Sequence, residues 1–318
     1  MLSVSRRLCA RLLLTFCVLA LSAASGTGGT AFANQKYAGL VVDVKTGRVL
    51  YSDRADEKRF PASLTKIMTL YILFEEIEAG KLDLNSPLKV STFAAAQMPT
   101  KLRLKVGRTI SVGDAMRALA VKSANDVAVV VAEAIGGSEE AFARRMTRKA
   151  HALGMKNTTF KNASGLHVPG QVTTARDMAI LGQSVQDRFP QHYKIFKSRT
   201  FKWGKRKYTN TNRLLGRVPG VDGIKTGYTR ASGFNLVTSV RSKDRHIIAV
   251  VMGGRTGKRR DAHMADLIRR YLMKASNGSR TAPHLIANPQ SSVPLPKERP
   301  GDLALKIATK SQLPIQTH

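Results

Sequence analysis

The hydrophobic pattern changes along the chain, from strand-like to helical and back to strand-like. The segment YAGLVVDVKTGRVLYSD (37–53) is typical of two strands around a Thr-Gly turn, which predicts a hairpin. Residues 64–77 are apolar on nearly every side, so we expect a helix that is buried centrally. Gly80 is positioned to end that helix.

Helical spacing continues through the middle of the chain, from Val112 to about Val185. Residues 112–136 predict two helices, with Ser123-Ala124-Asn125-Asp126 between them. Residues 138–154 form an amphipathic pattern that opens with a capping signal at Ser138. A further helix is entered through Thr173 or Thr174.

Strand patterns return near the end, in GIKTGYT, SGFNLVTSVRS and HIIAVVMGG. The last two are linked by the polar turn Lys243-Asp244-Arg245, and a final helix is expected over roughly 258–274. Strands at both ends therefore bracket a helical middle. The simplest arrangement is an α+β fold with one antiparallel sheet, covered by helices and carrying an inserted all-α lobe.

The two ends of the chain predict export and a flexible tail. Residues 1–33 combine three arginines, a short apolar core and an Ala-Phe-Ala site before Asn34, which is typical of a signal peptide. An uncleaved membrane anchor is the alternative. We expect a catalytic domain over 34–275 and a flexible Pro/Ser-rich tail over 276–318. The protein would then work in the periplasm or cell envelope.

Cysteine content and charge restrict the possible chemistry. Cys9 and Cys17 both lie in the predicted signal, so the mature chain has no thiol chemistry and no disulfide. Removing three arginines from 52 Lys and Arg leaves 49 against 21 acids, a net charge near +28. Anionic cell-envelope surfaces fit this charge better than nucleic acid, because no nucleic-acid recognition motif is present.

No metal-binding histidine pair and no phosphate-binding glycine loop occur, so neither a metal nor a cofactor is expected.

A hydroxyl and an amine stand three positions apart in the apolar segment FPASLTKIMTL (60–70). Ser63 and Lys66 would share a helix face. Burial favours a neutral lysine, which could then activate the serine as a nucleophile. The alternative interpretation is an N-cap serine beside a lysine whose stem alone is buried. Ser86–Lys89 has the same spacing, but Pro87 argues against a helix there.

Two more short motifs follow in order. Ser123-Ala124-Asn125 lies at the expected helix junction, where ordinary capping is the alternative. Lys225-Thr226-Gly227 precedes a strand. The same tripeptide at Lys45-Thr46-Gly47 is explained as a hairpin turn.

In this order the three motifs resemble those of the penicillin-recognising serine acyl-transferases. The wider phrases, over about residues 36–273, resemble D-alanyl-D-alanine carboxypeptidases of low molecular mass. The resemblance implies a β-lactamase/transpeptidase-like fold and removal of the terminal D-alanine from peptidoglycan stem pentapeptides. It also implies covalent inhibition by β-lactams such as penicillin.

The resemblance implies a role for each motif residue. Ser63 attacks the peptide carbonyl, Lys66 accepts its proton, Ser123 passes a proton to the leaving amine, and Asn125 holds the substrate and orients Lys66. Further implied substrate-binding residues are Lys225, Thr226, Gly227, Tyr228 and Arg260. The backbone N–H groups of Ser63 and Tyr228 would form the oxyanion hole, and Arg260 is chosen as a carboxylate clamp over its neighbours Arg255 and Arg259.

Three alternatives stay open. A class A β-lactamase would need a glutamate for deacylation, and the chain has none between Glu140 and Glu298. A D,D-endopeptidase that cuts cross-links would carry the same motifs. A non-catalytic cationic wall-binding protein would keep the charge without the chemistry.

Family members often end in an amphipathic membrane anchor. The tail here contains Pro314 and has little amphipathic length, so we expect at most peripheral attachment through positive charge.

Overall fold

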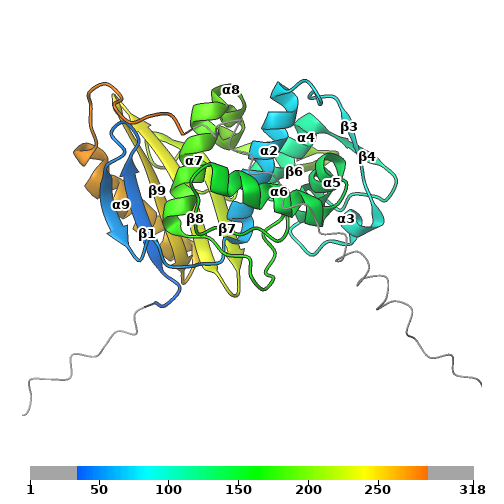
Figure 1. The fold of residues 1–318 in the computed structure, drawn as a ribbon, viewed down its shortest axis with the longest axis horizontal. Helices are drawn as coiled ribbons and strands as arrows, with labels where there is room; N and C mark the ends of the chain where they lie inside the picture. Colours follow the sequence, from blue (N-terminus) through cyan, green and yellow to red (C-terminus); the bar gives the residue numbers. More distant parts are fainter. Residues whose placement is uncertain (1–33, 286–318) are drawn as a thin grey trace, which may run out of the picture. The chain divides into compact units, whose positions relative to one another are not determined.

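Strands from both ends of the chain join in one five-stranded antiparallel sheet, in the order β2-β1-β9-β8-β7 (Figure 1). This arrangement comes from a computed structural model that describes residues 34–285. The predicted sheet is confirmed, and the predicted N-terminal hairpin forms its first two strands. The strands are β1 (Ala38–Asp43), β2 (Val49–Asp53), β7 (Val221–Thr229), β8 (Gly233–Ser242) and β9 (Arg245–Gly254).

The sheet buries both of its faces, and strand periodicity divides its side chains between them. In β9, Ile247, Ala249 and Val251 pack with helix α9 (Gly257–Tyr271). Ile248 and Val250 belong to a larger core on the other face, with α2 (Lys66–Glu78) and α7 (Ala175–Arg188). Figure 1 shows α7 and α9 on opposite faces of this sheet.

The central helix begins later than the sequence suggested. Residues Ala62–Thr65 form a 3-10 turn, η1, and the α-helix α2 starts at Lys66. In a 3-10 turn, residues three apart are nearly eclipsed, so the tighter turn brings Ser63 and Lys66 together more directly than an α-helix would. The prediction that this segment is buried is confirmed, since α2 lies at the centre of the core.

The helical lobe is inserted between the strands, as predicted, but it is not all-α, because it also carries two short paired strands at residues 87–89 and 109–111. Ser138 caps α6 by accepting the amide of Ala141, and Thr174 caps α7 in the same way. Asn125 and Asp126 already lie in the first turn of α5, so the junction between the two helices is shorter than expected. The lobe contains α3 (Thr92–Ala96), α4 (Val112–Arg117), the π-helical turn η2 (Ala118–Lys122), α5 (Asn125–Gly136) and α6 (Glu139–Ala152).

Two small two-stranded sheets were not anticipated from the sequence. One pairs β3 (Pro87–Lys89) with β4 (Thr109–Ser111) across a connection that contains α3, and the other is a hairpin of β5 (Thr200–Trp203) and β6 (Arg206–Thr209). Ser86–Lys89 therefore lies in a loop and a strand, where its spacing gives no shared helix face. The remaining short elements are α8 (Pro190–Tyr193), η3 (Lys194–Lys197) and η4 (Leu272–Lys274).

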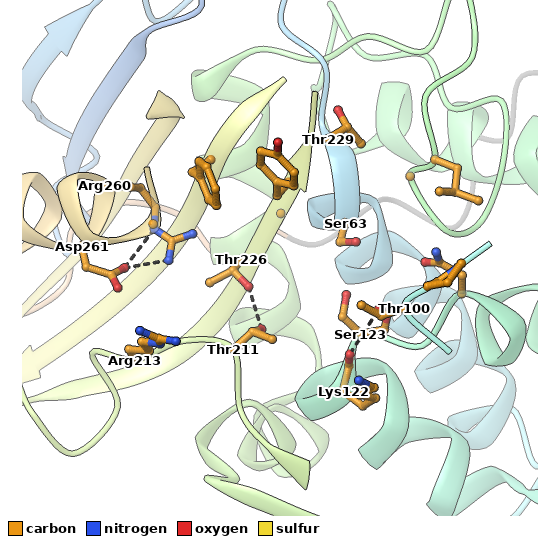
Figure 2. Close-up of a pocket in the computed structure, with 18 of the residues that line it drawn as sticks. Ser63, Thr100, Lys122, Ser123, Thr211, Arg213, Thr226, Thr229, Arg260 and Asp261 are labelled. Atoms are coloured by element: carbon orange, nitrogen blue, oxygen red, sulfur yellow. Dashed lines mark hydrogen bonds and ion pairs between the residues drawn. The ribbon is translucent and has the colours of Figure 1, made fainter. Parts of the chain in front are cut away.

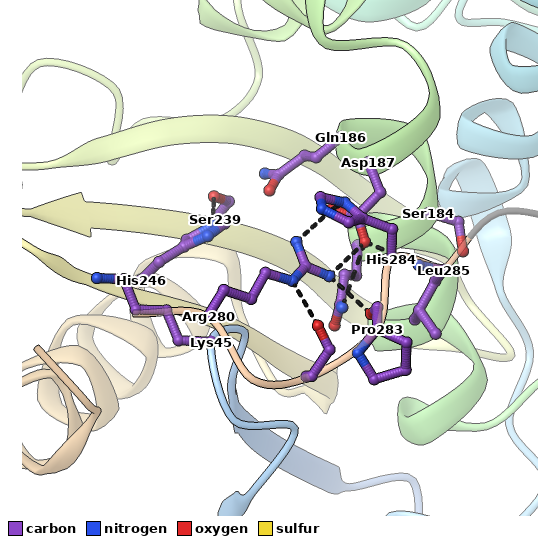
Figure 3. Close-up of polar contacts among 12 residues, drawn as sticks. Lys45, Ser184, Gln186, Asp187, Ser239, His246, Arg280, Pro283, His284 and Leu285 are labelled. Carbon is purple, nitrogen blue, oxygen red and sulfur yellow. Dashed lines mark hydrogen bonds and ion pairs between the residues drawn. The ribbon is translucent and has the colours of Figure 1, made fainter. Parts of the chain in front are cut away.

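The described start of the predicted tail, residues 276–285, is packed on the domain. Arg280 forms a two-pronged ion pair with Asp187 at the end of α7, at 2.6 and 2.8 Å (Figure 3). The amides of Thr281 and Ala282 both donate to the carbonyl of Lys45. Flexibility was expected from residue 276. These bonds correct that expectation for 276–285, because they fix the backbone to the hairpin turn and to α7. The predicted signal (1–33) and the rest of the tail (286–318) lie outside the described residues.

Across the described residues, no helix combines the length and the apolar character needed to span a membrane.

Candidate active site

A cavity of about 580 Å³ lies between strand β7 and the α lobe. Seven of the nine residues predicted for the site line it, and they come from four separate parts of the chain (Figure 2). Lys66 and Lys225 do not line the cavity, because both are buried behind its wall. The seven lining residues are Ser63, Ser123, Asn125, Thr226, Gly227, Tyr228 and Arg260.

Ser63 is held at the cavity by close backbone packing. Ala62, just before it, has φ +48°, a conformation that is uncommon for a residue with a side chain. A Cβ on Gly165 would stand 1.9 Å from the Ala62 carbonyl oxygen, so only glycine fits against this turn. From the sheet, the side-chain amide of Asn235 donates to the carbonyls of Phe60 and Pro61 at 3.0 and 3.2 Å. These contacts fix the direction of the serine.

The Lys66 amine has three polar neighbours. Its Nζ lies 2.7 Å from Asn125 Oδ1, 2.5 Å from the Ser164 carbonyl oxygen and 3.3 Å from Ser63 Oγ. The first two can only accept hydrogen bonds, whereas the hydroxyl can donate or accept. A neutral Lys66 therefore directs its two N–H groups to the acceptors and leaves its lone pair facing Ser63.

Burial lowers the pKa of Lys66 well below its usual value of 10.5. The nearby charge of Lys225 lowers that pKa further, while Asp126 and Glu139 oppose the shift. Desolvation penalises the ammonium form, and a second cation adds repulsion. The site thus favours a neutral amine next to a serine hydroxyl.

Ser123 presents a hydroxyl that has no hydrogen-bond partner among the described residues. It ends the π-helical turn η2 in a left-handed conformation, with φ 62° and ψ 40°. Its carbonyl accepts a hydrogen bond from Thr100 Oγ1 at 2.7 Å. A buried hydroxyl that lines the cavity without a partner is free to bond a substrate.

The loop that covers this side of the cavity is fixed by the start of α5. Asn125 Nδ2 donates to the Met98 carbonyl at 2.9 Å, which turns its Oδ1 towards Lys66. The Asp126 carboxylate accepts the amides of Leu102 and Arg103. The segment Ser123-Ala124-Asn125, which directly precedes Asp126, is therefore held between this loop and the central helix α2.

Strand β7 carries Lys225, Thr226 and Gly227 past the serine. A Cβ on Gly227 would stand 3.0 Å from the Ser63 backbone nitrogen, so this glycine permits the close approach of the two backbones. Burial, and then the charge of Arg260, lower the pKa of Lys225 to about 7. Thr226 Oγ1 donates to Thr211 Oγ1 at 2.7 Å.

Arginines line the sheet side of the cavity. Arg260 lines it, whereas its neighbours Arg255 and Arg259 are exposed and do not. The Arg260 guanidinium contacts Asp261 Oδ1 at 2.7 and 2.9 Å and donates to the Asn235 carbonyl. Arg213 also lines the cavity and is exposed (Figure 2).

Sequence reasoning missed Arg213 and Asn235 as parts of the site. Asn235 stands in the quoted phrase SGFNLV, so that phrase was the available signal for it. No motif marked Arg213, which reaches the cavity through the path of the loop between β6 and β7. Among the described residues, no group of three or more His, Cys, Asp or Glu is placed to hold a metal ion.

Comparison with known proteins identifies a peptidase family. The family described as D-alanyl-D-alanine carboxypeptidase, peptidase S11, matches residues 30–256. The chain is 35% identical over 263 residues to the D-alanyl-D-alanine carboxypeptidase DacF of Bacillus subtilis, covering 81% of this chain and 67% of that one. It is 40% identical over 226 residues to DacC of Escherichia coli, covering 69% and 56%. The chain thus spans less than two thirds of the length of DacC. A D-alanyl-D-alanine endopeptidase of Pseudomonas aeruginosa is 34% identical over 205 residues, covering 62% and 64%.

Solved structures show the same fold. The D-alanyl-D-alanine carboxypeptidase DacD of Francisella tularensis is similar with a TM-score of 0.71 and 32% identity, covering 74% of this chain and 70% of that one. Penicillin-binding protein D2 of Listeria monocytogenes, in its ampicillin-bound form, is similar with a TM-score of 0.64 and 30% identity, covering 73% and 95%.

Proposed function

The chain belongs to the D-alanyl-D-alanine carboxypeptidase family of serine peptidases, and we propose that it removes the terminal D-alanine from peptidoglycan stem pentapeptides through an acyl-enzyme on Ser63. The observation that carries this proposal is the environment of the Lys66 amine. It is buried, and two of its three polar neighbours can only accept hydrogen bonds.

Acylation begins at the Ser63 hydroxyl. Neutral Lys66 takes the proton while Ser63 Oγ attacks the carbonyl carbon of the penultimate D-alanine, forming a tetrahedral oxyanion. The backbone N–H groups of Ser63 and Tyr228 are the proposed donors to that oxyanion. The close approach of β7 to Ser63, which Gly227 permits, supports this assignment.

The leaving amine needs a proton when the carbon–nitrogen bond breaks. Ser123 lines the cavity with an unpartnered hydroxyl, so it is placed to pass the proton from Lys66 to the departing D-alanine. Asn125 holds the Lys66 amine in position during both steps. Water then hydrolyses the ester with Lys66 as base, which frees Ser63.

Recognition of the terminal carboxylate falls to the cationic side of the cavity. The Thr226 hydroxyl, which donates to Thr211 Oγ1 in this structure, would instead donate to the substrate carboxylate. Lys225 and Arg260 supply positive potential behind it, and the exposed guanidinium of Arg213 can meet the carboxylate directly. A β-lactam presents a similar carboxylate and an acylating carbonyl, so it should trap Ser63 covalently.

Removing the nucleophile tests the proposal. Wild-type protein should release free D-alanine from a stem pentapeptide and gain a benzylpenicillin adduct on the peptide that contains Ser63. Ser63→Ala should abolish both. The matched control is Ser86→Ala, in the other S-x-x-K segment, and it should change neither. Turnover that survives Ser63→Ala, or an adduct at another serine, would overturn the mechanism.

Product analysis separates the related alternatives. Release of D-alanine from uncross-linked peptides supports a carboxypeptidase, whereas cleavage of cross-linked dimers alone would indicate an endopeptidase like the Pseudomonas relative. Sacculus binding without turnover in the wild type would indicate a non-catalytic wall-binding protein.

Export to the envelope also belongs to the proposal. The leader-like residues 1–33 and the net positive charge support a mature protein that starts at Asn34 and associates peripherally with anionic envelope surfaces. High salt should release such a protein.

A further inference from the structure

The β5–β6 hairpin (200–209) concentrates positive charge on its exposed surface. Lys202, Lys205, Arg206 and Lys207 are all exposed. Within residues 34–285, none of these four side chains forms an ion pair with an acid. We call these four residues the hairpin cations.

The hairpin places like charges directly opposite each other. Lys202 on β5 pairs across the strands with Lys207 on β6, and Thr200 pairs with Thr209. Like charges in opposed positions destabilise a strand pair. The arrangement therefore costs stability in the free protein, and a bound anion would offset that cost.

The chain around the hairpin offers no compensating acid. Between Asp187 and Asp222, residues 188–221 contain ten Lys and Arg and no Asp or Glu. The segment thus carries a formal charge of +10, out of about +28 for the proposed mature chain. Such a concentration of one sign attracts polyanions.

The hairpin is fixed beside the cavity. Both of its strands pack against η2. The Nζ of Lys122, the last residue of η2, stands 5.1 Å above the ring of Tyr208 on β6, and Lys122 lines the cavity. The surface that bears the hairpin cations is therefore anchored next to the site that takes the stem peptide.

We propose that the hairpin cations bind free carboxylates of peptidoglycan peptides that neighbour the stem in the cavity. The inference rests on the proposed function, because it takes the cavity's substrate to be part of that polymer. Each uncross-linked stem ends in a carboxylate, so the polymer displays repeated anions along its length. Binding several of them would keep the protein on its substrate between cleavages.

An anionic membrane surface fits the hairpin less well. Interfacial binding combines positive charge with apolar side chains that enter the bilayer. The exposed large apolar side chains of the described residues all lie on other elements. Trp203 is half-buried and packs against the core, with the ring of Phe201 6.4 Å away. The hairpin offers charge without an apolar anchor.

The test is binding of the full-length mature chain to purified sacculi stripped of attached polymers. All proteins carry Ser63→Ala, so the polymer stays intact. Changing Lys202, Lys205, Arg206 and Lys207 to Gln should weaken binding on the order of tenfold at low salt, because several exposed charge contacts are lost together. A matched control changes Lys89, Lys105, Arg108 and Lys156 to Gln, which removes the same charge elsewhere, and should bind within about twofold of its parent.

Two further arms identify the anion. On sacculi whose carboxylates have been amidated, the Ser63→Ala parent and the hairpin variant, in which the four hairpin cations are also changed to Gln, should bind equally weakly. Equal binding of the two proteins to native sacculi would overturn the proposal, as would a difference that survives amidation. A loss confined to phosphatidylglycerol vesicles would also overturn it and assign the hairpin to a membrane.

Folding and activity are checked in matched proteins that retain Ser63. The hairpin variant should be acylated by a fluorescent penicillin at the parental rate. If the fourfold variant fails to fold, Lys205→Gln with Arg206→Gln at the turn replaces it. Binding is measured in Ser63→Ala proteins and does not depend on turnover. If the protein that retains Ser63 released no D-alanine, the proposed function would be refuted, but the binding result could still be interpreted.

Discussion

The tripeptide Lys-Thr-Gly occurs twice in this chain, in two opposite environments. Lys45-Thr46-Gly47 forms the turn between β1 and β2. Asp43 accepts the amide of Lys45 and the hydroxyl of Thr46, and the Lys45 carbonyl accepts two amides of the segment 276–285 that passes beside it (Figure 3). Every polar contact there serves to close a turn and fix the chain's last described segment.

Lys225-Thr226-Gly227 lies within strand β7, and all three residues are buried. Its lysine faces the interior, with Arg260 near enough to depress its pKa. Its glycine faces the backbone of Ser63. The same three letters therefore give a turn in one place and a part of the site in the other. Burial and neighbouring charge decide between them.

The largest expected difference between the copies is in the lysine. Lys225→Ala should slow penicillin acylation by about 10²–10³-fold, the usual effect of removing one preorganised electrostatic group from a reaction site. Lys45→Ala removes a hydrogen bond to the Gly278 carbonyl and should leave the rate unchanged. Stopped-flow acylation of both variants measures this. Equal rates would show that the second copy has no role in acylation.

The two glycines should differ by a smaller factor than the two lysines. Substituting Gly227 should lower the acylation rate, whereas substituting Gly47 should lower the unfolding free energy. A Cβ at position 227 meets the Ser63 and Leu64 amide nitrogens at 3.0 and 3.1 Å, so Gly227→Ala must shift the serine. Such a displacement costs about 10²-fold in rate. Gly47 has φ +72°, and a Cβ there would make only an ordinary contact with Ala282 Cβ at 3.6 Å, so Gly47→Ala should keep full activity and lose about 1 kcal/mol of unfolding free energy.

Acylation kinetics and urea unfolding on the two glycine variants separate the effects. A Gly227→Ala protein with unchanged acylation would contradict the close approach of β7 to Ser63. An inactive Gly47→Ala protein would contradict the structural assignment of the first copy.

The sheet and its cores were predictable because their periodicity is strong. The continuous apolar run of β9 and the all-round apolar character of α2 leave few other ways to bury those side chains. The choice between the two tripeptides was also possible from sequence, since a Thr-Gly turn in a hairpin explains the first copy without any chemistry.

Other features depended on contacts between distant residues. The Ser164 carbonyl that accepts from Lys66 is a backbone atom 98 residues away, and no side-chain pattern announces it. The segment 276–285 looked flexible by composition, yet Arg280 finds Asp187 and becomes fixed. The β5–β6 hairpin was not predicted from the sequence. Phe201 and Trp203 alternate with charged positions as in a strand, but the many cations of the segment made this pattern hard to distinguish from a polar loop.

The smallest difference we expect between the copies appears on the alkaline side of the pH profile. With its pKa near 7, Lys225 is cationic below that pH and neutral above it, so its contribution to acylation should fade as the pH rises past 7. The acid side should instead follow Lys66, which loses its role as base when it gains a proton. Arginine stays charged throughout. A neutral Lys225 still fills its site and can donate to the Thr226 carbonyl, so the alkaline loss should be smaller than the loss in Lys225→Ala. Lys225→Arg should therefore move the alkaline decline to higher pH. At pH 9 its rate, as a fraction of its own maximum, should exceed the corresponding wild-type fraction by roughly tenfold or less.

Penicillin acylation rates from pH 5.5 to pH 10 provide the measurement for that last comparison, with thermal unfolding to confirm that the larger side chain is accommodated. Lys45→Arg is the matched control, and its profile should overlay the wild type. If the Lys225→Arg profile overlays it as well, the alkaline decline belongs to another group. The second lysine would then differ from the first in burial but not in its effect on the reaction.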